Sequence, residues 1–385
     1  MPLTFPIEIP LSALEEAMAG VPDRPAVFLV RMRQGAPYLG RTTLLRRRLK
    51  RLFGERPGAS RLLTLRGLAE AVEYWPVASR LESMLVFYDL AMKWFPDNYL
   101  KIIRLRFPAY VSVLLANQFP RTQITTKLGA RSLYYGPFRM RASAELFESA
   151  VLDLFQLRRC VEDLAPSPEH PGCIYGEMNM CLRPCQAAVS MEEYRSEVQR
   201  FLDFLHTGGH SLTEPLAAAR DRLSEETNFE EAARLHKRIE KIEQAATLSD
   251  ELAADVDRLF GVAVTPSIQP RAVELWFVAR GIWLPPQRFS TEAAERSISI
   301  DQRLREIVAA LDEPRASARE RQEHIALLAR WYYSSWRDGE WLQFGSFAEI
   351  PYRRLVRAIS KTVRDAAVAV KPEGATSRRL PETLR

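Results

Sequence analysis

A chain of 385 residues usually forms two or three domains, and a hydrophobic share of 47% supplies a buried core for each of them. No stretch has the roughly 20 uncharged apolar residues that cross a bilayer, and the first ten residues lack a basic region followed by an apolar one, so we expect a soluble, cytoplasmic protein. The net charge of +6 is a mild bias, and the distribution of the basic residues is more informative than their sum.

The first predicted elements are a β-hairpin and a basic helix. Residues 26–30 are an apolar run of strand length, and Tyr38, Leu39 and Gly40 close a second strand after a Gly-Ala-Pro turn. Apolar residues then recur at helical spacing as far as Phe53, which predicts an amphipathic helix with its arginines mainly on the other face. This cationic face favours a phosphate backbone, with a solvated helix surface as the alternative. The candidate DNA-binding residues are Arg41, Arg46, Arg47, Arg48, Lys50 and Arg51.

Strands and helices follow one another along the rest of the chain. Strand patterns occur at residues 73–76, in parts of 101–127, and as a β-hairpin over 272–289. The chain ends in a segment, 371–385, with too few apolar residues to order. The predicted helices span 79–93, 143–155, 191–206, 300–311, 316–336 and 351–368. The fold class is therefore α/β, of the α+β kind.

Residues 216–227 and 229–248 predict a helical hairpin after the Gly208-Gly209 joint. Asn228 is placed to cap the second helix, and Glu231 three residues later completes a capping-box pattern. Apolar residues then recur at intervals of three and four. Two helices cannot bury such a stripe alone, so either a neighbouring domain or another protein covers it. The residues expected to face that partner are Phe229, Ala232, Ala233, Leu235 and Ile239.

The four cysteines of the chain, Cys160, Cys173, Cys181 and Cys185, lie within 26 residues of one another, and the last three form a C-x7-C-x3-C run. Four thiolates can complete the shell of a soft metal or an iron–sulfur centre, which we favour over two disulfides or four incidental core thiols. The prolines and glycine around them cannot support long regular elements, so a bound ligand would supply the order of this segment.

Taken in order, the YLG hairpin, the arginine helix, the FPR and YYGPF segments, the cysteine run and the NFEEAARLHKRI hairpin resemble one family. That family is UvrC, the incision subunit of bacterial nucleotide excision repair, and the resemblance covers roughly residues 20–250. It implies a GIY-YIG endonuclease domain at the start of the chain, with Tyr38 and Arg48 at catalytic positions. In such a site a tyrosine helps to deprotonate water, an arginine steadies the phosphate, and a glutamate holds Mg²⁺ or Mn²⁺.

Two of these catalytic positions are degenerate. Phe28 stands where the family has the tyrosine of Gly-Ile-Tyr, and a phenyl ring cannot transfer a proton. Alignment of the helix that begins near Glu82 puts Phe87 at the position of the metal-binding glutamate. Glu82 and Asp89 lie on other faces of that helix. We therefore expect the nuclease chemistry to be lost, and Mg²⁺ or Mn²⁺ to be a cofactor only if the site is active.

The resemblance also implies a [4Fe-4S] cluster on Cys160, Cys173, Cys181 and Cys185, with zinc as the alternative, since both take four thiolates. It implies that the helical hairpin is a UVR motif that binds a UvrB-type protein. His236 and Lys237 replace the usual Arg-Asp pair, which leaves the apolar stripe intact and changes its polar rim.

The expected organisation is a GIY-YIG-like domain, a cysteine-cluster linker domain, a UVR hairpin, an α+β region resembling a partial RNase H-like domain, and a tail. No Asp-Gly-Gly-x-Gly segment supplies the aspartate of that RNase H-like nuclease, and Asp338-Gly339 is better interpreted as a turn. The expected function is DNA and UvrB-type partner binding in repair. The alternatives are an active endonuclease making a single incision, using Tyr38, Arg48 and a carboxylate such as Glu82, and a scaffold that does not bind DNA. The domain ranges are 1–105, 106–206, 210–250, 251–370 and 371–385.

Overall fold

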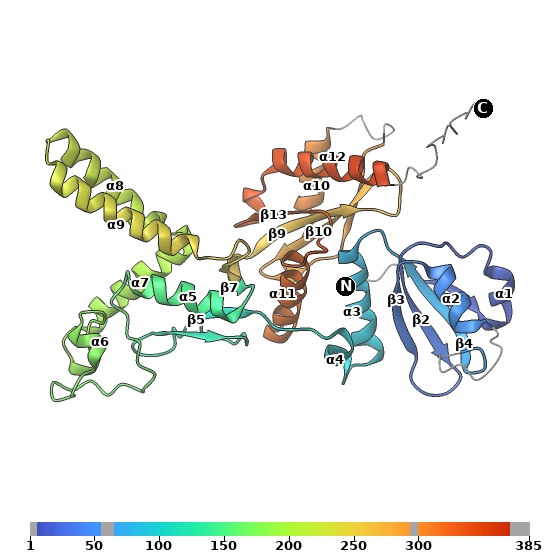
Figure 1. Ribbon diagram of the computed structural model, residues 1–385, viewed down its shortest axis with the longest axis horizontal. Helices are drawn as coiled ribbons and strands as arrows, with labels where there is room; N and C mark the ends of the chain where they lie inside the picture. Colours follow the sequence, from blue (N-terminus) through green and yellow to red (C-terminus); the bar gives the residue numbers. More distant parts are fainter. Residues whose placement is uncertain (1–5, 55–64, 293–298, 370–385) are drawn as a thin grey trace, which may run out of the picture.

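The computed structural model describes residues 6–54, 65–292 and 299–369, and the predicted tail at 371–385 lies outside them. The fold is mixed α+β, with three antiparallel sheets and helices packed on their faces (Figure 1). Within the described ranges no helix has the length and apolar character that crossing a membrane requires.

The first sheet has the strand order β1-β4-β2-β3. Alternate side chains of β2 point to its two faces, as the period of a strand requires. Phe28 and Val30 pack against α2, whereas Val27 and Leu29 pack against α3 on the opposite face. The elements are β1 (Ile7–Pro10), α1 (Leu14–Ala17), β2 (Ala26–Met32), β3 (Tyr38–Thr42), α2 (Leu45–Phe53), β4 (Ala69–Pro76), α3 (Arg80–Trp94) and α4 (Tyr99–Ile103).

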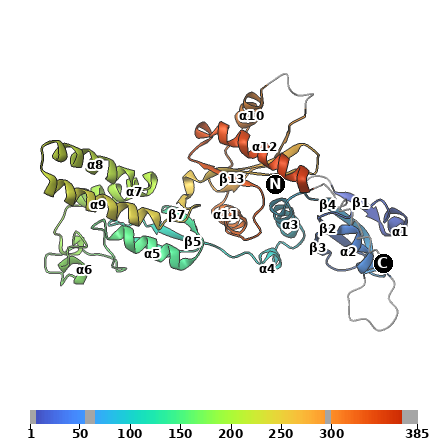
Figure 2. The same ribbon diagram turned by 45° about the horizontal axis from the view of Figure 1, so that its top comes forward.

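The second sheet, in the order β6-β5-β7-β8, carries helices α5 and α7. Its strand β8 arrives from beyond the helical hairpin formed by α8 and α9, which projects away from the sheets (Figure 1, Figure 2). The elements are β5 (Ala109–Val113), β6 (Thr122–Thr125), β7 (Leu133–Phe138), α5 (Arg141–Leu152), α6 (Ile174–Glu177), α7 (Met191–Thr207), α8 (His210–Glu225), α9 (Phe229–Thr247) and β8 (Ala254–Asp255).

The third sheet follows the order β11-β10-β9-β13, and β12 also pairs with β10. Helices α10 and α12 cover one face and α11 lies on the other (Figure 1, Figure 2). The elements are β9 (Phe260–Pro266), β10 (Ala272–Ala279), β11 (Ile282–Trp283), β12 (Gln287–Ser290), α10 (Ile300–Ala309), α11 (Ala318–Tyr332), β13 (Glu340–Phe344) and α12 (Tyr352–Ala369).

One apolar core joins the first and third sheets. Leu81, Leu85 and Tyr88 of α3 belong to the same buried cluster as Trp276 of β10 and Trp331 of α11. Helix α3 therefore packs against the first sheet with one side and against α11 and the third sheet with another. This contact places the start of α3 at the boundary between the two sheets.

The sequence predicted most of these elements, and two details differ. The second strand of the 272–289 hairpin is divided into β11 and β12, because Pro285 and Pro286 cannot donate to a ladder. Helix α9 begins after Asn228 as predicted, but the Asn228 side chain makes no capping hydrogen bond.

Candidate functional site

Tyr38 and Arg48, the two predicted catalytic residues, meet in the structure. Arg48 extends from α2 and donates a hydrogen bond of 2.9 Å from Nη2 to the Tyr38 hydroxyl on β3. Phe28 is fully buried beside them, with its ring centre 6.0 Å from that of Tyr38. A Cβ atom at Gly40 would lie 2.6 Å from the Phe28 ring, so the third residue of the YLG signature must be glycine. Position 28 therefore supports packing and has no group for proton transfer.

Phe87, at the predicted position of the metal ligand, faces Arg41. The guanidinium carbon of Arg41 lies 4.7 Å from the centre of the Phe87 ring, which is a cation–π contact. A carboxylate at position 87 would attract a divalent ion, whereas the phenyl face holds a guanidinium group. The structure thus places a fixed cation of the protein at this position.

The two nearby carboxylates of α3 are buried. Ser79 caps the helix by accepting a hydrogen bond of 3.0 Å from the Glu82 backbone N–H. Oε2 of Glu82 in turn accepts one of 2.7 Å from the Ala78 backbone N–H. Burial raises the pKa of Glu82 to about 7 and that of Asp89 to about 6. Glu82 therefore serves the helix terminus, and neither carboxylate lines the cavity that contains Arg48.

That cavity, of about 850 Å³, lies where the first sheet, the start of α3 and the end of α11 meet. We call it the first arginine cavity. Its walls are rich in arginine and contain a single acidic residue, Asp338. Withdrawal from water lowers the pKa of Arg41, and the charge of Arg330 lowers it further. The cationic side chains on the wall are Arg41, Arg48, Arg51, Arg80 and Arg330.

Asp338, which is distant from α3 in the sequence, caps the N-terminus of this helix. Its carboxylate accepts hydrogen bonds from the backbone N–H groups of Arg80 and Leu81 and from Nε1 of Trp331. Gly339 turns the chain with a positive φ of 75°. A negative group at a helix N-terminus is stabilised by the helix dipole. The expected turn is thus present, and its aspartate has a structural role.

The predicted DNA-binding residues divide into two groups. Arg41, Arg48 and Arg51 line the first arginine cavity. Arg46, Arg47 and Lys50 are not among its lining residues, and Nε of Arg46 donates a hydrogen bond of 2.6 Å to the Val21 carbonyl oxygen.

Sequence reasoning missed Arg80 and Arg330, because Arg80 is the single arginine of α3 and Arg330 is separated from the other arginines of α11 by two turns of helix. The sequence contained one signal for Arg80. A basic residue in the first turn of a helix opposes the dipole, so Arg80 at the start of α3 is costly without another role.

The cysteine segment follows α5 with only short helices. Cys160 and Cys173 are partly buried, Cys181 and Cys185 are buried, and all four are free thiols. Burial raises the pKa of Cys181 to about 11, and the other three thiols contribute to this rise, so the four are neighbours. Within the described ranges, however, no group of three or more His, Cys, Asp or Glu side chains has the geometry to hold a metal ion. The donor set suits a soft metal, and the predicted cluster stays a prediction.

The α8–α9 hairpin carries the residues predicted to face a partner. Ile242 and Ala245 at the base of α9 join the core of the second sheet, so a neighbouring part of the chain covers that end. Ala232 and Ile239 are buried, and Leu235 is half-buried. Phe229 is 66% exposed at the far end, and Ala233 is also exposed. The surface left for a partner is thus the tip of the hairpin.

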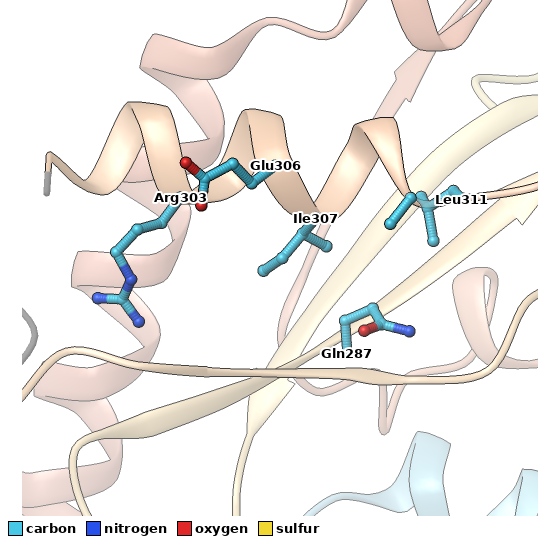
Figure 3. A pocket seen from close by; sticks show the side chains of 6 residues that line it. Gln287, Arg303, Glu306, Ile307 and Leu311 are labelled. Atoms are coloured by element: carbon cyan, nitrogen blue, oxygen red, sulfur yellow. The ribbon is translucent and has the colours of Figure 1, made fainter.

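A further pocket lies between α10 and β12 (Figure 3). Its volume is about 360 Å³, and Ile307 and Leu311 form its apolar wall. Gln287, Arg303 and Glu306 are its polar side chains, and none of its residues belongs to a predicted site.

Comparison with known proteins shows which proteins this chain resembles. Residues 109–204 match the family described as UvrC/Cho excinuclease, middle domain. UvrABC system protein C of Caldanaerobacter subterraneus is 26% identical over 273 residues, which cover 70% of this chain and 44% of the relative. Residues 109–204 thus match the UvrC-type middle domain, and the chain is distantly similar to UvrC proteins over about 70% of its length.

Other UvrC relatives agree. UvrABC system protein C of Lachnospira eligens is 24% identical over 73% of this chain and 47% of its own length, and that of Ruminiclostridium cellulolyticum is 24% identical over 72% and 46%. The chain thus spans less than half the length of the UvrC proteins it matches. No solved structure matches it. The matched residues contain β5, β6 and β7 of the second sheet, α5, most of α7 and all four cysteines.

Proposed function

We propose that this protein acts in nucleotide excision repair as a UvrC-like DNA-binding protein whose GIY-YIG site does not cut. It would hold DNA in the first arginine cavity, carry a [4Fe-4S] cluster or zinc on its four cysteines, and bind a UvrB-type protein through the hairpin tip. A cluster or zinc, when bound, would fix the short segments of residues 160–185.

The observation that supports this proposal most directly is the composition of the first arginine cavity. It combines Arg41, Arg48, Arg80 and Arg330 with one carboxylate, Asp338, which already accepts hydrogen bonds from two backbone N–H groups. Hydrolysis of a phosphodiester with a divalent ion needs oxygen ligands for that ion. Guanidinium groups bind phosphate oxygens well and cannot bind a metal ion. The cavity therefore suits binding of a nucleic-acid backbone better than its cleavage.

One observation favours an active endonuclease instead. The hydrogen bond between Arg48 and Tyr38 keeps two members of the expected catalytic set together. The third member would have to be Glu82, and its carboxylate is buried, bonded to the Ala78 N–H and absent from the cavity wall. This rival requires Glu82 to leave its helix-capping position.

The decisive experiment is a nicking assay with a binding assay beside it. Purified protein with Mg²⁺ or Mn²⁺ should leave damaged, UvrB-loaded duplex uncut. Arg48→Ala should raise the Kd for DNA about tenfold, because one charge-assisted hydrogen bond to a phosphate is removed. Arg353→Ala on α12, which removes an exposed arginine that does not line the cavity, is the matched control and should bind like the parent chain.

Two results would contradict the proposal. Nicking that disappears in Tyr38→Phe or Glu82→Gln would show that the site is an active endonuclease. DNA binding that is absent, or that does not weaken with added salt, would instead favour the scaffold, because phosphate contacts release counterions.

A further inference from the structure

A second basic cavity lies beside the first and shares Arg330 with it. It has a volume of about 500 Å³ and lies between the segment after α4, the end of β7 and helix α11. We call it the second arginine cavity. No acidic residue lines it. Its charged and aromatic wall residues are Arg104, Arg106, Phe107, Phe138, Arg139, Arg330 and Tyr333.

Arg330 is held between the two cavities. It extends from α11 and donates a hydrogen bond of 2.6 Å from Nη1 to the carbonyl oxygen of Ile103, at the end of α4. Withdrawal from water lowers the pKa of Arg330, and the charge of Arg106 lowers it further. Arg330 has the same effect on the pKa of Arg41 in the first cavity. Arg41, Arg330 and Arg106 are thus three successive cations that repel one another.

In the part of the chain that the structure describes, these arginines have no acidic partners, unlike several other arginines of the surface. Within the described ranges, arginines such as Arg288 and Arg321 form ion pairs with acidic neighbours. Arg41, Arg106 and Arg330 form no salt bridge with any described residue. Two acidic residues lie near the second cavity: Asp250 accepts a hydrogen bond from the backbone N–H of Arg139, and Glu251 accepts one from the Tyr332 hydroxyl. Grouped cations without acidic partners cost stability unless an anion is bound.

The volume and the lining residues of the second cavity indicate which kind of anion it binds. Its volume is in the range of ligand pockets and has room for one or two nucleotides. Phe107 and Tyr333 add partly buried aromatic surface to the arginines. Sites for single strands combine a cationic groove with aromatic side chains on which bases stack.

We propose that the two arginine cavities form one track for a single strand of DNA, with Arg330 between them. This inference rests on the proposed DNA-binding function and extends it. A strand whose phosphates enter the first cavity continues past Arg330 into the second cavity, where Arg106 and Arg139 bind its next phosphates. DNA would therefore contact the middle domain as well as the GIY-YIG-like part of the chain.

Binding of a fluorescein-labelled 16-nucleotide oligothymidine by the full chain, measured by fluorescence anisotropy over a salt series, tests the track. Arg106→Gln/Arg139→Gln should raise Kd about tenfold or more. The slope of log Kd against log salt should fall by about 0.7 for each phosphate of the single strand that the variant no longer neutralises. The control Arg353→Gln/Arg354→Gln removes two exposed arginines of α12 and should match the parent chain.

A first-cavity variant, Arg48→Gln/Arg80→Gln, separates failure of the track from failure of the proposed function. If this variant weakens binding while Arg106→Gln/Arg139→Gln behaves like the control, the track is wrong and the DNA-binding function stands. If neither variant weakens binding, both proposals fall.

The track can also be tested on the unaltered chain, so the test does not depend on whether a variant folds. Oligothymidine with 4-thiothymidine at successive positions should crosslink to peptides around Phe107 or Tyr333 as well as to those around Arg48. Crosslinks confined to the first cavity would overturn the track.

Discussion

At the scale of single residues, Glu82 shows how a carboxylate near a nuclease-like site can be structural. Burial raises its pKa to about 7, well above the value of an exposed glutamate. At pH values between the pKa of an exposed glutamate and about 7, Glu82 is protonated in the folded state and ionised in the unfolded state. The free energy of unfolding therefore falls as pH rises through this range and levels off above about pH 7. Glu82→Gln keeps an oxygen for the Ala78 N–H and removes the titration. Urea unfolding at pH 5 and pH 8 should therefore show the variant gaining up to a few kcal/mol relative to the parent chain at pH 8. If the difference in free energy of unfolding between the variant and the parent chain is the same at pH 5 and pH 8, Glu82 is ionised in the folded state at both pH values.

At the scale of elements, the α8–α9 hairpin separates residues that hold it together from those that are free to bind. Phe229 is 66% exposed, whereas Ile239 is 5% exposed. Phe229→Ala should leave the free energy of unfolding within about 0.5 kcal/mol of the parent value, because most of the ring already faces solvent. It should weaken binding of a UvrB-type protein, measured by calorimetry, by about 2 kcal/mol if the ring is a hot spot. Ile239→Ala should instead destabilise the chain by about 2–5 kcal/mol. Gln244→Ala, at an exposed position near the base of α9, is the control, and equal binding by Phe229→Ala and this control would exclude the hairpin tip as the docking site.

At the scale of the whole molecule, a buried polar network joins distant parts of the chain. Glu323 of α11 is 2% exposed and accepts hydrogen bonds of 2.7 Å from the hydroxyls of Tyr88 in α3 and Tyr99 in α4. Nε of Arg319 donates a third, of 3.1 Å. Glu323→Gln should lower the free energy of unfolding by about 1–3 kcal/mol, because the amide offers one acceptor oxygen where the carboxylate offers two. Urea titration beside Glu320→Gln, an exposed position on the same helix, checks this. Equal stabilities of the two variants would mean that the network adds nothing to the contact between α3 and α11.

Local pattern was enough for much of the fold and for part of the site. Helical periodicity predicted α2, α3, α7 and α9 close to their observed bounds, since each buries a face with apolar residues at regular spacing. The short helix α4 and strand β13 were missed, because a segment of only a few residues is too short to show a hydrophobic periodicity. The order of motifs predicted the family, and the hairpin and basic helix brought Tyr38 and Arg48 into one hydrogen bond.

The sequence by itself determined which chemical groups are present: phenyl rings at positions 28 and 87, four clustered thiols, and arginines scattered over several segments. Only the tertiary structure decided which of these groups meet. Asp338 caps a helix that begins at Arg80, and Arg41, Arg330 and Arg106 become neighbours from three separate segments. These contacts arise when the helices α3 and α11 bury their apolar faces in a shared core. Periodicity shows that each helix has such a face, and the packing of complementary side chains selects which face it meets.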